Sequence, residues 1–354
     1  MAVFNKKQEL ADLLKSMDFK TLLIFQHNAY DIQILCTGSS LKKNLPLIVL
    51  CILFVFLLLF PVQALASSKT GLILWFDSLL PTLLPFLIIS QLILKTPIIS
   101  YVQSLIGPLF RKLFHCSDTG AFCMLCGFLC GYPVGARLIA LQIQENNLTL
   151  PEGQYLLSFC NNVSPMFCIS YGILYAIGAK TVLPYLLIIY GSPLFFGLLT
   201  RPAVLPDKTA AVKKQTSSAE NLFQLIDVCI IDSFLIMIKL CGYLILFSMI
   251  STGILMIIPL KTPLIPSLVT SFLEITDGLS RVTLLPQGIF RTAVCIAALS
   301  FGGLCCIFQT NSVINGTGLS FTKYILHKVL ITLLALLFFF LWCFFCSFTI
   351  NGRS

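Results

Sequence analysis

Long apolar runs separated by short polar stretches cover most of the chain. A helix needs about 20 apolar residues to cross the hydrocarbon core of a bilayer. The pattern therefore predicts an all-α fold, a polytopic transmembrane helical bundle of roughly eight to ten apolar segments. The apolar runs are residues 45–66, 71–94, 97–114, 119–143, 153–178, 181–200, 222–258, 263–280, 288–309 and 323–350.

Several of these runs contain residues that break helices. Pro81 and Pro85 interrupt the second run, the sequence GYP at 131–133 interrupts the fourth, and NNVSP at 161–165 interrupts the fifth. Proline removes a backbone donor and clashes with the preceding turn of a helix. The run at 97–114 is too short to cross a bilayer comfortably. We therefore expect broken or re-entrant helices among the membrane segments.

Polar stretches divide the chain into parts. These are an N-terminal cytoplasmic extension (1–44), a first membrane half (45–200), a polar linker (201–221) and a second membrane half (222–350). The order of features in the second half echoes the first, with a glycine cluster in each, at 121–135 and at 293–306. Interrupted segments at matching places are typical of transporters built from repeats. The sequence thus predicts two repeat-like halves.

Composition identifies the solvent of most of the chain as lipid. Hydrophobic residues make up 57% and charged residues 10% of the sequence, and the mean hydropathy is +0.95. A soluble domain has about 25% charged residues, so we expect a multi-pass protein of the cell membrane. The net charge of +9 does not imply a nucleic-acid partner, because the basic residues follow the positive-inside pattern at segment ends. Examples are Lys42, Lys43, Arg111, Lys112, Lys213 and Lys214.

The first candidate site is a glycine-rich break followed by a cation. Gly131 and Tyr132 precede Pro133, and Arg137 follows about one turn later. Lipid offers no partner to the carbonyls that such a break frees, so protein or water must satisfy them. We predict that Gly131, Tyr132 and Arg137 contact a ligand. The alternative is tight helix packing, with Arg137 reaching to the membrane interface.

The second candidate site is the polar sequence before Pro165. Asn161, Asn162 and Ser164 lie in an apolar run, where each polar group needs a partner. Pro165 can start a helix that Asn162 or Ser164 caps. A helix N-terminus with unpaired amides suits an anionic group. The alternative is a hydrogen-bond network between helices that binds no ligand.

The third candidate site lies in the second half. Gly302 and Gly303 allow close approach of another backbone, and Gln309 and Asn311 are buried amides nearby. If the halves pack about a pseudo-two-fold axis, Gln309 and Asn311 face Arg137 and the asparagines of the first half.

Other charged residues have less specific assignments. Asp232 and Lys239 are seven residues apart and so share one face of a helix. Glu274 is expected to pair with Arg281 or with amides near residue 278. A proton-coupling role at Asp77 or at Glu274 stays open beside simple anchoring at the membrane interface.

The sequence offers no residue set for catalysis, for a metal or for another cofactor. Its 15 cysteines lie mostly in apolar runs, where cysteine behaves as a small hydrophobe. The spacing of Cys123, Cys126 and Cys130 is therefore interpreted as packing, not as a metal site. With three histidines and no pairing of nucleophile and base, the chain is not expected to be an enzyme.

Five blocks resemble the sporulation integral membrane protein YlbJ family. They are GLILWFDSLLPTLLPFLIIS (71–90), GYPVGARLIAL (131–141), LLSFCNNVSPMF (156–167), FLEITDG (272–278) and SFGGLCCIFQTNS (300–312). That family belongs to the nucleoside-recognition Gate group, which is similar in architecture to concentrative nucleoside transporters. The resemblance covers about residues 45–350. It implies a role in endospore maturation, at the outer forespore membrane of a sporulating bacterium.

The resemblance also implies an activity, the movement of dipicolinate out of the mother cell. This planar dicarboxylate would suit Arg137 and the amides of half-helix termini. The expected partners are a small anionic solute and the lipid bilayer, and a homo-oligomer stays open. The alternative function is a non-transporting scaffold or assembly factor. Convergence of the buried Asn, Gln and Arg side chains on one cavity favours transport, whereas their scatter along helix seams favours the scaffold.

Overall fold

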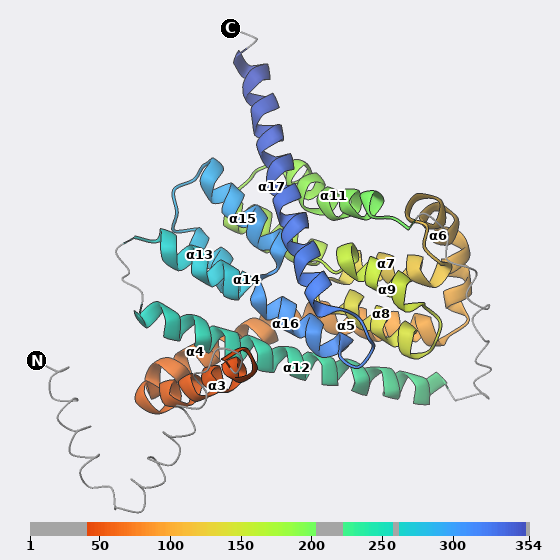
Figure 1. Ribbon diagram of the computed structural model, residues 1–354, viewed down its shortest axis with the longest axis horizontal. Coiled ribbons are helices and arrows are strands. Elements are labelled where there is room, and N and C mark those ends of the chain that lie inside the picture. Colours follow the sequence, from red (N-terminus) through yellow and green to blue (C-terminus); the bar gives the residue numbers. More distant parts are fainter. Residues whose placement is uncertain (1–40, 203–221, 258–261, 352–354) are drawn as a thin grey trace, which may run out of the picture. The chain divides into compact units, whose positions relative to one another are not determined.

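The computed structural model describes residues 41–202, 222–257 and 262–351, which Figure 1 shows as a ribbon. Within these ranges the chain forms helices joined by turns and contains no strand, so the predicted all-α fold is confirmed. The expected N-terminal extension at 1–44 and the linker at 201–221 lie almost entirely outside the described residues.

The chain forms two units that divide after Pro61. The described part of the first unit is helix α3 (Leu41–Leu59). Helix α4 (Pro61–Leu74) begins two residues after α3 ends, so the predicted run 45–66 is divided between two helices. Proline is favoured at the first position of a helix, where its missing N–H loses no intrahelical bond.

The second unit begins with the rest of the first membrane half. After α4 come the π-helical turn η1 (Trp75–Leu79), α5 (Leu80–Lys95), α6 (Ile98–Phe114), α7 (Asp118–Cys130), α8 (Val134–Gln144), α9 (Leu150–Cys160), the short α10 (Pro165–Phe167), the π-helical segment η2 (Cys168–Ile177) and α11 (Leu183–Leu199). The expected re-entrant or interfacial piece at 97–114 is α6, which is bent by 92° relative to α7.

The second membrane half follows in the same unit. It consists of α12 (Leu222–Ile257), α13 (Leu264–Leu273), α14 (Ile275–Val282), α15 (Ile289–Phe301), α16 (Gly303–Ile314) and α17 (Phe321–Asn351). Helix α5 packs against α12, and α11 packs against α17. Helix α17 also contacts α9, α15 and α16, so it joins elements of both halves.

Broken helices lie at corresponding places in the two halves. Among the described residues, α7 and α8 are separated at 131–133, α9 and α10 at 161–164, α13 and α14 at Glu274, and α15 and α16 at Gly302. In each half, two broken helices are followed by an unbroken one. By this order the break at Gly302 corresponds to 161–164, whereas the sequence paired it with the first glycine cluster. The predicted breaks at 131–133 and 161–165 are confirmed, whereas the interruption expected at Pro81 and Pro85 is wrong, because α5 runs unbroken through both.

The outer surface of the second unit is apolar. Three helical stretches of the described chain are long and apolar enough to cross a membrane, namely Leu222–Ile257, Ile289–Ile314 and Phe321–Phe345, and joining bent helix pairs raises the number to five. Large hydrophobic side chains on these helices are exposed, such as Ile238 and Leu333. A monomeric soluble protein rarely exposes such contiguous apolar surface. The fold is therefore that of an integral membrane protein.

Arg291 holds the ends of two half-helices together. This side chain is buried, and its Nε donates a hydrogen bond to the carbonyl of Ala176 at 2.8 Å, close to the end of η2. Its Nη1 donates to the carbonyls of Thr283 and Leu285, just after α14, at 3.2 and 3.3 Å. Helix C-termini leave carbonyls without partners and carry partial negative charge. The guanidinium satisfies both needs at once.

Replacing Arg291 with methionine should destabilise the protein strongly. The buried carbonyls of Ala176, Thr283 and Leu285 would lose charge-assisted hydrogen bonds, which contribute about 1.5–3 kcal/mol each. We expect a loss of about 3 kcal/mol or more, measured by denaturation of the full-length protein in mixed micelles. The matched control is Arg281→Met, because Arg281 forms a partly exposed ion pair with Asp277 at 3.2 Å. Its loss should cost about 1 kcal/mol or less. Equal losses in the two variants would refute the assignment.

Candidate functional site

The four breaks of the second unit meet one another. A Cβ atom added to Gly131 would lie 2.5 Å from the backbone nitrogen of Ser164, which joins the two breaks of the first half. A Cβ on Gly303 would lie 3.3 Å from the nitrogen of Ile275, which joins the two breaks of the second half. A Cβ on Gly302 would lie 2.7 Å from the hydroxyl of Tyr132, which joins the halves. An added Cβ would crowd its neighbours at Gly131 and Gly302 and be tight at Gly303, and all three positions have the left-handed backbone that favours glycine.

Two of the breaks are capped by their own polar side chains. Ser164 accepts a hydrogen bond from the amide of Phe167 at 3.4 Å, so it is the N-cap of the helix that Pro165 starts. The carboxylate of Glu274 accepts from the amides of Thr276 and Asp277, at 3.0 and 2.7 Å. Of the two partners expected for Glu274, the structure shows the amides, while Arg281 pairs with Asp277.

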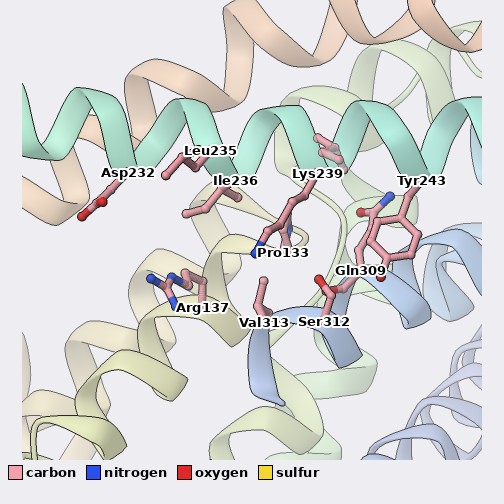
Figure 2. A pocket seen from close by; sticks show the side chains of 11 residues that line it. Pro133, Arg137, Asp232, Leu235, Ile236, Lys239, Tyr243, Gln309, Ser312 and Val313 are labelled. Carbon is pink, nitrogen blue, oxygen red and sulfur yellow. The ribbon is translucent and has the colours of Figure 1, made fainter. Parts of the chain in front are cut away.

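A polar pocket of about 140 Å³ lies between α8, α12 and α16, as Figure 2 shows. Arg137 comes from α8, Gln309 and Ser312 from α16, and Asp232 and Lys239 from α12. The remaining lining residues are Pro133, Leu235, Ile236, Leu240, Tyr243 and Val313. We call this hollow the outer pocket. It brings together Arg137 and Gln309, which the sequence analysis expected to face each other.

The charges of the outer pocket are unbalanced toward positive. Asp232 pairs with Lys95, with 3.9 Å between Oδ2 and Nζ. Neither Arg137 nor Lys239 forms an ion pair within the part of the chain that the structure describes. In Figure 2 the Lys239 side chain extends from α12 toward the space that Arg137 borders. Two cations without carboxylate partners can bind an anion.

A smaller hollow of about 60 Å³, the inner pocket, lies where the breaks meet. Its wall includes Tyr132 from the first break, Ser164 from the second, Glu274 from the third and Gln309 beyond the fourth. Gln309 and Leu240 line both pockets. These two side chains therefore form the wall between the outer and the inner pocket.

The two asparagines lie behind the inner pocket in a buried polar network. Asn161 donates from Nδ2 to Thr310 at 2.9 Å and to the hydroxyl of Tyr324 at 3.1 Å. Asn162 accepts through Oδ1 from Nζ of Lys328 at 3.3 Å. Asn161 and Asn162 line neither the outer nor the inner pocket. Their contacts match the alternative given for this segment, a hydrogen-bond network between helices that binds no ligand.

The remaining predicted residues have clear positions. Gly131, Gly302 and Gly303 are contact points between breaks and take left-handed backbone conformations, with φ of 81°, 86° and 74°. Asn311 is partly buried on α16 and lines neither pocket. Cys123, Cys126 and Cys130 are buried in the hydrophobic core, as expected of packing residues.

Sequence reasoning missed Lys328 and gave Lys239 no role in a site. Lys328 is only 1% exposed and lies in the apolar helix α17. An ionisable residue inside an apolar segment is a functional candidate by default, so its position in the run 323–350 was a usable signal. The role of Lys239 could not be predicted from the sequence, because it depends on which face of α12 meets α8 and α16 in the tertiary structure.

Comparison with known proteins assigns part of the chain to a class. Residues 76–192 match the Gate family, which is described as nucleoside recognition. This range includes the first two breaks and Arg137. The chain is thus an integral membrane protein of which residues 76–192 are similar to the Gate family.

Part of the chain is also similar to a sporulation protein. The chain is 37% identical over 107 residues to the sporulation integral membrane protein YlbJ of Bacillus subtilis (strain 168). The aligned part is 30% of this chain and spans about a quarter of the relative, 26%. No solved structure matches. The resemblance predicted from the sequence blocks is confirmed, as a similarity over this part of the chain.

The crossing at Gly302 can be tested by substitution. Gly302→Ala places a methyl group against the Tyr132 hydroxyl at a φ of 86°, which costs about 1–3 kcal/mol for the backbone conformation alone. We expect a lower thermal unfolding midpoint for the purified full-length protein in micelles. The control is Gly242→Ala on α12, where no atom of the described residues outside the adjoining turns of the helix lies within 4 Å of the added carbon. That change should leave the midpoint unchanged or raise it. A Gly302→Ala protein as stable as the control would contradict the contact between halves.

Proposed function

We propose that the protein is a membrane transporter of a small organic anion, with dipicolinate as its substrate, acting in endospore maturation at the outer forespore membrane. It would move this solute without changing it chemically and without nucleic acid or a cofactor. The observation that carries the proposal is the outer pocket, in which Arg137, Lys239 and Gln309 border one space.

The electrostatics of the outer pocket support an anionic substrate. A guanidinium offers paired N–H donors that match a carboxylate, and an ammonium adds a second point of attraction. Gln309 and Ser312 add neutral hydrogen-bonding groups. A planar dicarboxylate could contact Arg137 with one carboxylate and Lys239 with the other. The pocket volume of about 140 Å³ is below the about 300–1,000 Å³ of drug-sized sites and suits a single small ring.

The architecture supports transport rather than a purely structural role. Broken helices of two repeat-like halves that meet at one place are typical of secondary transporters, which bind their solutes there. The similarity to a sporulation membrane protein supports the biological setting. Dipicolinate itself is inferred from that resemblance and from the charge of the pocket.

Replacing Arg137 with alanine should weaken dipicolinate binding about tenfold to a hundredfold, because a charge-assisted hydrogen bond contributes about 1.5–3 kcal/mol. Arg137→Lys should lie between wild type and Arg137→Ala, since it keeps the charge and loses the forked geometry. Binding would be measured on full-length protein in nanodiscs, and uptake in proteoliposomes.

The control for these variants is Arg201→Ala. Arg201 is exposed, lines neither pocket and contacts the carbonyl of Leu113 at 3.5 Å, so its loss should leave binding unchanged. Excess uridine tests the other substrate class, because a nucleoside is neutral and should compete poorly. A wild-type protein that neither binds nor moves dipicolinate would favour the scaffold function.

Asp232→Asn should strengthen dipicolinate binding, whereas the Arg137 variants should weaken it. Asp232 is the one carboxylate in the lining of the outer pocket, and its charge opposes an anion. Because its side chain is 42% exposed and pairs with Lys95, screening keeps the effect small. We expect binding to be strengthened about twofold to fivefold at low ionic strength, and less at high salt. Weaker binding by Asp232→Asn would argue against an anion in this pocket.

A further inference from the structure

Lys328 is a buried cation whose partners are all neutral. Its Nζ donates to the backbone carbonyl of Asn161 at 3.4 Å and to Oδ1 of Asn162 at 3.3 Å, and it lies 5.1 Å from the centre of the Tyr132 ring. It forms no ion pair with any described residue. An ionisable group at membrane depth normally pairs with another charge or with backbone carbonyls, and Lys328 has only the second kind of partner among the described residues. The protein supplies oxygen atoms and an aromatic face here, but no counter-charge.

Among the described residues, no carboxylate faces Lys328. The titratable groups that face it are the phenol of Tyr132 and the thiol of Cys306 on α16, while the phenol of Tyr324 on its own helix accepts a hydrogen bond from Asn161. Helix α9 presents Asn161 and Asn162. Within the described chain, no hydrogen bond or charge interaction joins Lys328 to α11 or α15, although both pack against α17.

The inner pocket comes within one side chain of Lys328. Tyr132 and Cys306, which both face the lysine, also line the inner pocket. Its volume of about 60 Å³ is enough for a few water molecules, each of which needs about 10–15 Å³. The inner pocket in turn shares Gln309 and Leu240 with the outer pocket. Water in the inner pocket is therefore separated from Lys328 by one layer of side chains, and an anion in the outer pocket is separated from the inner pocket by Gln309 and Leu240.

We propose that Lys328 carries the proton of a proton-coupled anion cycle, and that the transported anion is its missing counter-charge. This inference rests on the proposed transport function. With an anion bound, Nζ takes a proton from water in the inner pocket and is an ammonium. When the anion leaves on the other side, Nζ returns that proton to water there. No bond forms between Lys328 and the solute.

Linkage makes the coupling reciprocal. A bound anion favours the charged form of a nearby cation, and the charged lysine favours the bound anion by the same free energy. Proton and anion therefore move in the same direction. Lys328 also holds the break at Asn161–Ser164 through two oxygen atoms of that segment. When Lys328 loses its proton, its hydrogen bonds to this segment weaken. The segment includes Ser164, which lines the inner pocket.

The test compares Lys328→Gln with Lys323→Gln in full-length protein reconstituted into proteoliposomes. Lys323 lies on the same helix and is exposed, so it is the matched control. The membrane potential is clamped with potassium and valinomycin, and internal pH is followed with pyranine. For one proton per solute, an inward acid gradient of about one pH unit should give wild type an accumulation ratio of about ten.

Lys323→Gln should match wild type. Lys328→Gln should lose the gradient-driven accumulation and the proton entry, while it still exchanges labelled for unlabelled dipicolinate. Accumulation and proton entry that persist in Lys328→Gln would overturn the role of Lys328 and leave dipicolinate transport standing. Accumulation by wild type without proton entry would also overturn the role of Lys328, and this result does not depend on whether the variants fold. Absence of both uptake and exchange by wild type would overturn the transport function and this inference together.

Discussion

The fold depends on satisfying backbone groups that broken helices leave open inside an apolar environment. Each unpaired amide or carbonyl costs several kcal/mol in hydrocarbon, so a break is tolerated only where protein or water supplies partners. The protein meets this constraint by bringing its breaks together. Glu274 and Ser164 cap new helix starts, whereas Arg291 binds carbonyls at helix ends. Glycines at the crossings allow the backbones to approach closely enough.

The same constraint explains why polar side chains and hollows occur together. Segments that avoid lipid must collect in the interior, and their caps bring carboxylate, amide and hydroxyl groups with them. Helices α12 and α17 then enclose this polar centre with apolar outer faces and contribute one lysine each, Lys239 and Lys328. The chain thus places positive charge at the rim and deep inside, with Gln309 in the wall between the two pockets.

Sequence reasoning located the breaks at 131–133 and before Pro165 because their causes are local. The pair Gly302–Gly303 is equally visible along the chain, but it was interpreted as a close approach of backbones and not as a break. The break at Glu274 was missed, since no proline or glycine marks it. Only the hydrogen bonds that its carboxylate accepts from the amides of Thr276 and Asp277 show why the helix restarts. Lys239 became a site candidate only through packing, because its neighbours do not follow from spacing along the chain, whereas the position of Lys328 inside an apolar run was a signal that sequence reasoning did not use.

The separation of the two pockets bears on how a charge could cross. Leu240 and Gln309 close the wall between them, and both sit on helices that contact each other, α12 and α16. Helix α16 begins at Gly302–Gly303, so a small change at that hinge would move Gln309 without unwinding either helix. An anion passing this wall would leave Arg137 and Lys239 and approach Lys328. In the proposed transport cycle, a cation of the protein would replace part of the anion's lost hydration at each stage of its passage through the apolar bundle.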